Sequence, residues 1–173
     1  MASVKAKNSK TGEELEYRLI QYTGEEHVDE IMSAMEADLS EPYNIFTYRY
    51  FLNRWPELTF LAMIPDDKDK SKEKCIGAIV CSIEDTKNGR RRGYIAMLAV
   101  TKEYRHYKIG STLVKKAIDE MKDADEIALE TETNNAAALG FYGKLGFIRS
   151  KKMFKYYLSG TDAYQLILPI TPF

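Results

Sequence analysis

The sequence predicts an α/β (α+β) fold in which a central mixed, mostly antiparallel seven-stranded sheet is flanked by about four helices. Two observations favour this class. Segments with the apolar and polar alternation of strands are interleaved with segments of helical periodicity, in the order β-α-α-β-β-β-α-β-α-β-β. Hairpin-type connections flank this order and require antiparallel neighbours, whereas the strand–helix–strand segment in the middle requires a parallel crossover.

Size and composition indicate one domain. The chain has 173 residues, of which 45% are hydrophobic and 29% charged, the balance of an ordinary soluble globular protein. Residues 1–14 are polar and are expected to form a flexible leader, followed by a single domain over residues 15–173. Lys and Arg number 25 against 26 Asp and Glu, so no global charge favours direct nucleic-acid binding or an anionic membrane.

The apolar stretches are too short to cross a bilayer, so no membrane partner is expected. Only two histidines, His27 and His106, are present, which excludes a multi-histidine metal centre, and no metal site is expected. Cys75 and Cys81 both fall in one apolar, strand-like run and are interpreted as buried thiols.

The first three elements follow from the spacing of apolar residues. Residues 16–22 (EYRLIQY) alternate as a half-buried strand does. A helix is expected over residues 25–37, because helical spacing places on one face Val28, Ile31, Met32 and Met35. The turn-forming segment 38–44 (DLSEPYN) ends that helix. A second helix stops at Pro56, and its apolar stripe is formed by Tyr48, Phe51, Leu52 and Trp55.

Three strands are expected next, over residues 58–64 (LTFLAMI), 75–83 (CIGAIVCSI) and 92–100 (RGYIAMLAV). The charged segment 65–74 reads as an exposed loop between the first two. Asn88-Gly89 predicts a hairpin between the last two, because both residues tolerate positive φ.

A helix over residues 109–121 buries one face, formed by Ile109, Leu113, Ala117, Ile118 and Met121. A strand over 126–132 (EIALETE) and a short helix over 135–144 follow, and Leu145-Gly146 ends that helix. Two final strands, over 147–154 and 163–168, are separated by the Ser159-Gly160 turn.

The turn between the strand ending at Val100 and the helix starting at Ile109 has the composition of an anion site. A helix N-terminus presents unpaired backbone N–H groups and the positive end of the helix dipole. Arg105 and Lys108 lie beside those groups, and Gly110 lets the backbone approach a bulky ligand. A diphosphate would fit here, although basic residues before a helix are also often only solvated.

This turn resembles a known motif. Arg105-x-x-Lys108-x-Gly110 is similar to the acetyl-CoA motif of the GNAT acetyltransferases, Arg/Gln-x-x-Gly-x-Gly/Ala, which seats the pyrophosphate of coenzyme A. The family usually has glycine where this chain has Lys108, and we expect the lysine to contact a phosphate of the coenzyme. Over residues 17–168 the chain also resembles the catalytic subunit of NatC-type N-terminal acetyltransferases, in the blocks ADLSEPYNIFTYRYFLNRWPEL, RRGYIAMLAV, EIALETETNNAAALGFYGKLGF and KMFKYYLSGTDAYQLIL.

The resemblance implies a GNAT fold and transfer of acetyl from acetyl-CoA to the α-amino group of nascent proteins that start Met-hydrophobic (Met-Leu, Met-Ile or Met-Phe). It further implies a cytoplasmic, ribosome-associated enzyme with two auxiliary NatC subunits and no metal. Two alternatives stay open: a GNAT enzyme acting on lysine or a small amine, and a non-catalytic CoA-binding scaffold subunit.

The catalytic candidates begin on the strand 126–132. Alternation puts Glu130 and Glu132 on the same face, either as working carboxylates or simply pointing to solvent. By resemblance Glu130 is the general base and Glu132 its support. Tyr142 matches the family's tyrosine near the thioester sulfur, or is a core aromatic beside Phe141. Leu98 matches the family's backbone N–H donor to the thioester oxygen.

The remaining positions carried over by the resemblance bind the coenzyme or the peptide. Coenzyme contacts are expected at Leu98, Val100, Arg105, Lys108, Ile109, Gly110, Ser111, Asn135 and Tyr142. Asn135 stands equally well as the cap of the helix that follows it. Peptide contacts are expected at Glu41, Tyr43, Glu130, Tyr156 and Tyr157. Residues 90–92 (RRR) are interpreted as a solvated edge, with a ribosome contact as the alternative.

Overall fold

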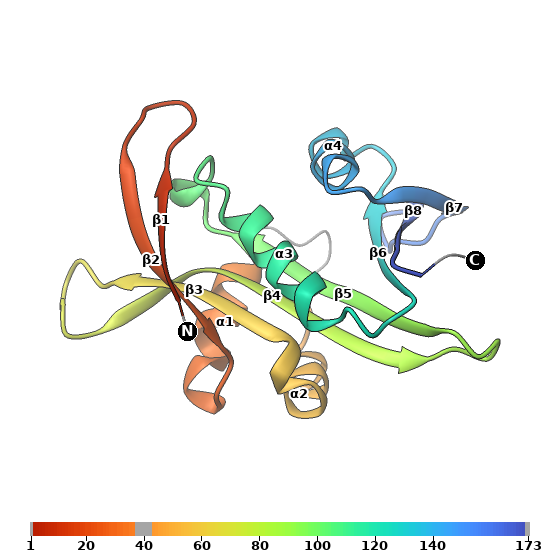
Figure 1. Ribbon diagram of the computed structural model, residues 1–173, viewed down its shortest axis with the longest axis horizontal. Coiled ribbons are helices and arrows are strands. Elements are labelled where there is room, and N and C mark those ends of the chain that lie inside the picture. Colours follow the sequence, from red (N-terminus) through yellow and green to blue (C-terminus); the bar gives the residue numbers. More distant parts are fainter. Residues whose placement is uncertain (1, 37–42, 172–173) are drawn as a thin grey trace. The chain divides into compact units, whose positions relative to one another are not determined.

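The computed structural model describes residues 2–36 and 43–171, and these fall into two compact units. The first unit comprises Met1–Cys81 and Ala96–Glu120, and the second comprises Ser82–Ile95 and Met121–Phe173. Figure 1 labels the helices and strands of both. Two long strands, β4 (Glu73–Asp85) and β5 (Arg91–Val100), run through the boundary and contribute to each unit.

The first unit has an antiparallel sheet with three α-helices. Its remaining elements are β1 (Ala2–Lys7), β2 (Glu14–Gln21), α1 (Val28–Glu36), α2 (Ile45–Arg54), β3 (Thr59–Pro65) and α3 (Ile109–Glu120). Strand β1 pairs with β2, β2 with β3 and β3 with β4, all antiparallel. These ranges confirm the predicted helices and strands of this part of the chain to within a few residues.

The predicted flexible leader over residues 1–14 is wrong. Residues 2–7 form strand β1, which pairs with β2 from Ala2↔Leu19 to Lys7↔Glu14. The segment is polar because an edge strand needs few apolar side chains. The alternation of Val4 and Ala6 with lysines is too short to predict a strand, and the strand is held by backbone hydrogen bonds to β2. The single domain expected over residues 15–173 stays a prediction, and the chain divides into the two compact units given above.

Helices cover both faces of the first unit's sheet. One buried cluster joins α1 and α2 to the strands, through Ile31, Met35, Tyr48, Leu52, Leu61, Met63, Ala78, Val80, Met97 and Ala99. Helix α3 packs on the opposite face, where Lys116 lies 5.4 Å above the ring of Phe60. The predicted apolar stripes of α1 and α2 are therefore confirmed as core.

Gly77 on β4 fixes how closely α3 approaches the sheet. A methyl group at this position would lie 3.2 Å from the Ala99 carbonyl oxygen, 3.3 Å from a methyl of Ile109 and 3.4 Å from a methyl of Leu113. The first turn of α3 therefore sits directly on the backbone of β4, and the loop before it starts from a fixed point.

The second unit contains the parallel crossover. Its further elements are β6 (Glu126–Glu132), α4 (Ala136–Lys144), β7 (Ile148–Met153) and β8 (Ala163–Pro169). Strand β5 pairs with β6 in parallel at residues 92–94, while β6 with β8 and β7 with β8 are antiparallel. The hydrogen-bonded order of the described strands is β1-β2-β3-β4-β5-β6-β8-β7, eight strands where seven were predicted, because β1 was not anticipated. The predicted fold class is confirmed.

The turn between β4 and β5 forms where Asn88-Gly89 predicts it. Gly89 has φ 80° and its N–H donates to Thr86 O at 3.1 Å, while Thr86 N–H donates to Arg90 O at 2.7 Å. Only the glycine takes positive φ, so the turn uses the conformational freedom of one residue of the pair.

Both cysteines are free thiols. Cys81 is buried, as predicted, and Cys75 is half-buried. Burial raises the pKa of the Cys75 thiol to about 12 and raises that of Cys81 as well. Neither thiol is therefore available as a thiolate nucleophile near neutral pH.

In residues 2–36 and 43–171 the structure has no helix long and apolar enough to cross a membrane.

Candidate active site

Two tyrosines hold the carboxylate of Glu130 in the second unit. Tyr94 on β5 donates a hydrogen bond from its hydroxyl to Glu130 Oε1 at 2.8 Å. Tyr156, from the loop between β7 and β8, donates to the same oxygen at 3.1 Å. Two phenols from different segments therefore fix the orientation of one carboxylate.

The second oxygen of the Glu130 carboxylate, Oε2, differs from Oε1 in its hydrogen bonding. Oε2 is buried and has no hydrogen-bond partner within the described part of the chain. An ionised carboxylate oxygen without a donor is unfavourable away from water, and native proteins rarely leave one so. The atom that faces no protein donor is thus the one suited to accept a proton or hydrogen bond from a bound molecule.

Tyr94 was missed by the sequence interpretation. The parallel pairing places it opposite Ala128, so that its long side chain reaches two residues further along β6 to Glu130. One signal could have identified it: within the alternating block RRGYIAMLAV, Tyr94 occupies the same set of half-buried positions as Leu98 and Val100.

Tyr142 is a buried aromatic of α4. Its ring centroid lies 4.9 Å from that of Phe141 and 5.5 Å from that of Phe147, both in edge-on arrangements. The side chain is 8% exposed. Its ring thus packs between aromatic residues of α4 and of the turn that follows it, as the core interpretation holds, and a role for its hydroxyl stays a prediction.

The predicted peptide-side tyrosines of the second unit lie together. The rings of Tyr156 and Tyr157 are 5.1 Å apart at 86°. The loop that carries them is closed by hydrogen bonds from Tyr157 N–H to Thr161 O, 3.2 Å, and from Gly160 N–H to Tyr157 O, 2.9 Å. Tyr156 is half exposed, and it reaches Glu130, so the structure links one of the two to the candidate base.

The basic turn belongs to the first unit and leads into α3. Arg105 Nε donates to the carbonyl oxygen of Val100 at 3.3 Å, which ties the turn to the end of β5. His106 and Lys108 have φ of 72° and 61°, in the left-handed region. Lys108 therefore stands at a position with positive φ, the conformation that glycine adopts without strain.

The start of α3 fits an anionic group. Thr112 donates both its N–H and its hydroxyl to Lys108 O, each at 3.0 Å, so Lys108 occupies the N-cap position. A lysine side chain has no acceptor atom and does not cap the first N–H groups as serine or aspartate would. The first turn of α3 contains no acidic residue. Positive charge and backbone donors thus coincide, as a diphosphate requires.

The remaining coenzyme positions on β5 and α3 differ in burial. Leu98 and Val100 are half-buried and alternate with the core residues Met97 and Ala99. Ile109 is buried, whereas Gly110 and Ser111 are half-buried.

On the peptide side of the first unit, Tyr43 is 39% exposed and packs edge-on against Tyr48, with centroids 6.3 Å apart. Glu41 lies outside the described residues.

Asn135 caps helix α4. Its Oδ1 accepts a hydrogen bond from Ala138 N–H at 3.0 Å, which is the cap predicted as one of two roles. The pantetheine contact, the other role, stays a prediction.

The two roles of Asn135 can be separated by substitution. Asn135→Ala should destabilise the chain by about 1 kcal/mol through loss of the cap, as measured by urea unfolding. Asn135→Asp keeps the acceptor and should unfold like the parent protein, but it removes the amide donor. A raised KM for acetyl-CoA in the Asp variant, which keeps the cap, would reveal the pantetheine contact, and an unchanged KM would leave Asn135 as a cap only.

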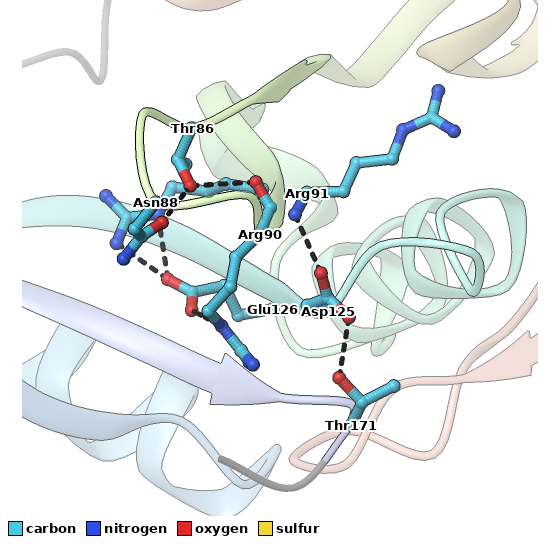
Figure 2. Close-up of polar contacts among 8 residues, drawn as sticks. Thr86, Asn88, Arg90, Arg91, Asp125, Glu126 and Thr171 are labelled. Atoms are coloured by element: carbon cyan, nitrogen blue, oxygen red, sulfur yellow. Dashed lines mark hydrogen bonds and ion pairs between the residues drawn. The ribbon is translucent and has the colours of Figure 1, made fainter.

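Residues 90–92 contact acids of the same unit, and Figure 2 shows Arg90 beside Glu126 and the Arg91 N–H directed at Asp125. Glu126 on β6 accepts from Arg90 Nε at 3.2 Å and from Arg92 Nε at 2.8 Å, and its side chain is only 5% exposed. Arg91 pairs with Asp123 at 3.0 Å. Arg90 and Arg92 thus share one nearly buried carboxylate, whereas Arg91 and its partner Asp123 are exposed to solvent, as expected for a solvated edge.

Asp125 fixes the segment that follows β8. Its Oδ1 accepts from the Thr171 hydroxyl at 2.7 Å, and its backbone oxygen accepts from Ile170 and Thr171 N–H (Figure 2). Hydrogen bonds from Arg91 N–H and Thr171 lower the pKa of the Asp125 carboxyl, so it stays ionised to a lower pH than an ordinary aspartate.

Comparison with known proteins assigns the family. Residues 28–147 match the family model described as "Acetyltransferase (GNAT) family". The chain is 50% identical over 160 residues to N-alpha-acetyltransferase 30 of Saccharomyces cerevisiae, covering 91% of this chain and 90% of the relative. It is 48% identical over 170 residues to N-alpha-acetyltransferase 30 of Mus musculus, covering 97% of this chain but only 45% of that relative. The chain thus spans less than half the length of the mouse protein.

A solved structure gives the same answer. A chain in the structure described as "Crystal structure of the NatC complex bound to Gag peptide and CoA" superposes with a TM-score of 0.81 at 49% identity, covering 90% of this chain and 98% of that one. The matched family model, the 50% identity to the yeast relative and this superposition together show that the chain belongs to the acetyltransferase (GNAT) family, in the branch of the N-alpha-acetyltransferase 30 proteins.

Proposed function

We propose that the protein is an N-terminal acetyltransferase that moves acetyl from acetyl-CoA to the α-amino group of proteins starting Met-hydrophobic, such as Met-Leu, Met-Ile or Met-Phe. Its relatives are named N-alpha-acetyltransferases, and the NatC structure to which it is similar holds a peptide and CoA. The observation that carries the proposal in this chain is the Glu130 carboxylate, oriented by two phenols and left with one unpartnered oxygen.

Glu130 acts in this proposal as the general base, directly or through a water molecule. A free α-amino group has a pKa of about 7.7–8.0, so an appreciable minority is neutral near pH 7 and a modest base suffices. Tyr94 and Tyr156 bind Oε1, which leaves Oε2 to accept the proton. Glu132, two residues along the same strand, supports the charge of the site.

Two further groups serve the thioester. The Tyr142 hydroxyl donates a proton or hydrogen bond to the departing thiolate, since a phenol can act as a donor to a thiolate. The backbone N–H of Leu98 faces the thioester oxygen, and a donor preset for a developing negative charge contributes about 3–4 kcal/mol to rate acceleration. Acetyl-CoA itself supplies the activated acetyl group.

The coenzyme is held along β5 and the turn into α3. The pantetheine arm lies on Leu98 and Val100, with Asn135 and Tyr142 as further contacts. The diphosphate binds the backbone N–H groups of Ile109, Gly110 and Ser111 beside Arg105 and Lys108. The positive φ of Lys108 and the acid-free first turn of α3 support this placement.

Tyrosines form the peptide site. Tyr43, Tyr156 and Tyr157 offer apolar surface to the second side chain of the substrate, with Glu41 as the acid that binds its backbone. Burying a Leu or Phe side chain contributes roughly 1.5–3 kcal/mol, which is enough to prefer it over a small polar residue. We further propose that the chain works in the cytoplasm with two auxiliary NatC subunits and meets the ribosome through that complex.

A peptide panel tests the activity and its specificity. Acetyl-CoA is incubated with Met-Leu and Ser-Glu peptides, and with a Met-Leu peptide that is blocked at its N-terminus and contains an internal lysine. Acetylation of the free Met-Leu peptide at its α-amine, several-fold faster than of Ser-Glu, is the expected result. The assay is repeated with the auxiliary subunits added.

Other outcomes of this panel would contradict the proposal. Acetylation of the blocked peptide at lysine would indicate a lysine acetyltransferase. No turnover on any amine, with or without the auxiliary subunits, would indicate a non-catalytic CoA-binding subunit.

A further inference from the structure

The turn into α3 contains two strained residues in close succession. His106 and Lys108 both have left-handed φ, 72° and 61°, and neither is glycine. Side chains with a Cβ are disfavoured there, and such conformations persist only when surrounding structure determines them. Something outside the turn must therefore hold residues 105–110 in place.

The tip of the β1–β2 hairpin lies beside this turn within the same unit (Figure 1), and two hydrogen bonds join them. Ser9 N–H donates to His106 O at 2.9 Å, at one of the strained residues. Between the two strained residues, the Tyr107 hydroxyl donates to Glu13 Oε2 at 3.3 Å. Tyr107 is 7% exposed, so its ring is packed while its hydroxyl reaches the hairpin.

The tip of the hairpin is itself rigid enough to act as a support. Asn8 N–H donates to Glu13 O at 2.8 Å and Gly12 N–H to Asn8 O at 2.9 Å. Asn8 Oδ1 accepts from Lys10 and Thr11 N–H, at 2.8 and 3.1 Å. The six-residue ladder of β1 and β2 then anchors this tip in the sheet.

We propose that the hairpin tip, residues 8–13, is a positioning element that holds the turn 105–110 in the conformation that binds the diphosphate of the coenzyme. Glu13 and Tyr107 are positioning residues: they act on the ligand through the backbone of the turn. The proposal rests on the proposed function, because it takes the ligand of this turn to be coenzyme A. It explains how the turn 105–110 can keep a conformation that binds the diphosphate although Lys108 occupies a position that favours glycine.

The test measures affinity for two ligands that differ in the diphosphate. Calorimetry gives the Kd of the full chain for CoA and for pantetheine, the thiol arm without the nucleotide. Tyr107→Phe keeps the packed ring and removes the hydroxyl, and Tyr104→Phe, three residues earlier, is the matched control. We expect Tyr107→Phe to weaken CoA binding by about threefold to tenfold, the usual effect of losing one hydrogen bond, because this bond is long at 3.3 Å and acts on the ligand only through the turn. Pantetheine binding, and CoA binding by the control, should not change.

A double-mutant cycle and a rescue extend the test. Glu13→Ala should weaken CoA binding as Tyr107→Phe does, and the double variant should be no worse than either alone. His106→Gly removes an exposed side chain and relaxes the turn, so it should restore most of the affinity lost in Tyr107→Phe. In kinetics, Tyr107→Phe should raise KM for acetyl-CoA and leave kcat unchanged.

The positioning role and the proposed function fail differently. If folded Tyr107→Phe binds CoA like the parent, or loses CoA and pantetheine affinity alike, the positioning role is wrong and the function is untouched. If the parent chain binds CoA no more tightly than pantetheine, the turn does not hold a diphosphate, and both are wrong.

Discussion

Replacing Glu130 with glutamine should lower kcat at least tenfold while leaving the fold intact. Glutamine keeps the shape of the side chain, and its carbonyl oxygen still accepts hydrogen bonds from Tyr94 and Tyr156. It cannot take up a proton from the attacking amine, and loss of a general base typically costs 10²–10⁴-fold in rate, or roughly 3–5 kcal/mol of barrier. Steady-state kinetics with a Met-Leu peptide measure the effect, and an unchanged unfolding curve shows that the fold is retained.

Glu132→Gln is the matched control for this substitution. It makes the same chemical change two residues away on the same face of β6, opposite Ala163 of β8. We expect it to alter kcat much less than Glu130→Gln. A Glu130→Gln variant with normal kcat, or a larger loss in Glu132→Gln, would remove Glu130 from the role of base.

Replacing Glu126 with glutamine should lower the free energy of unfolding by about 2–3 kcal/mol. Its nearly buried carboxylate is shared by Arg90 and Arg92, whose side chains are 24% and 35% exposed. Removing the negative charge leaves two guanidinium groups close together without the carboxylate that they share. Breaking a fully buried pair from one side costs about 3–5 kcal/mol, and the partial exposure of the arginines reduces this.

Asp123→Asn is the control for Glu126→Gln. Asp123 pairs with Arg91 at a similar distance, but both side chains are about half exposed or more. Exposed pairs contribute about 0–1 kcal/mol, so this variant should unfold almost like the parent in urea. Equal effects of the two substitutions would show that the Glu126 cluster does not stabilise the second unit.

Most of the fold could be predicted because its elements bury regular apolar patterns. The stripes of α1 and α2 and the alternation of β5 reflect contact with a core, and that contact is what fixes these elements. Strand β1 could not be predicted in this way. Its structure comes from backbone pairing with β2, which leaves little trace in the side chains of an edge strand.

Members of the candidate site could be predicted where the residue type alone indicates a catalytic role. They were harder to predict where the role depends on how distant segments are placed in the fold. Glu130 stood out as an acid on a buried strand. Its partner Tyr94 depends on the parallel register of β5 and β6, which is a tertiary property. The positive φ of Lys108 was missed for a similar reason. The helical pattern that follows Lys108 is compatible with ordinary dihedrals at this residue, and its strained dihedrals are permitted by contacts with a hairpin that is distant in the sequence.

A crystal structure of the chain soaked with coenzyme A would test the central claim most directly. We predict that the diphosphate lies against the backbone N–H groups of Ile109, Gly110 and Ser111, with Arg105 and the Lys108 ammonium at its oxygens. A diphosphate bound elsewhere, or a turn blocked by the Lys108 side chain, would contradict the account.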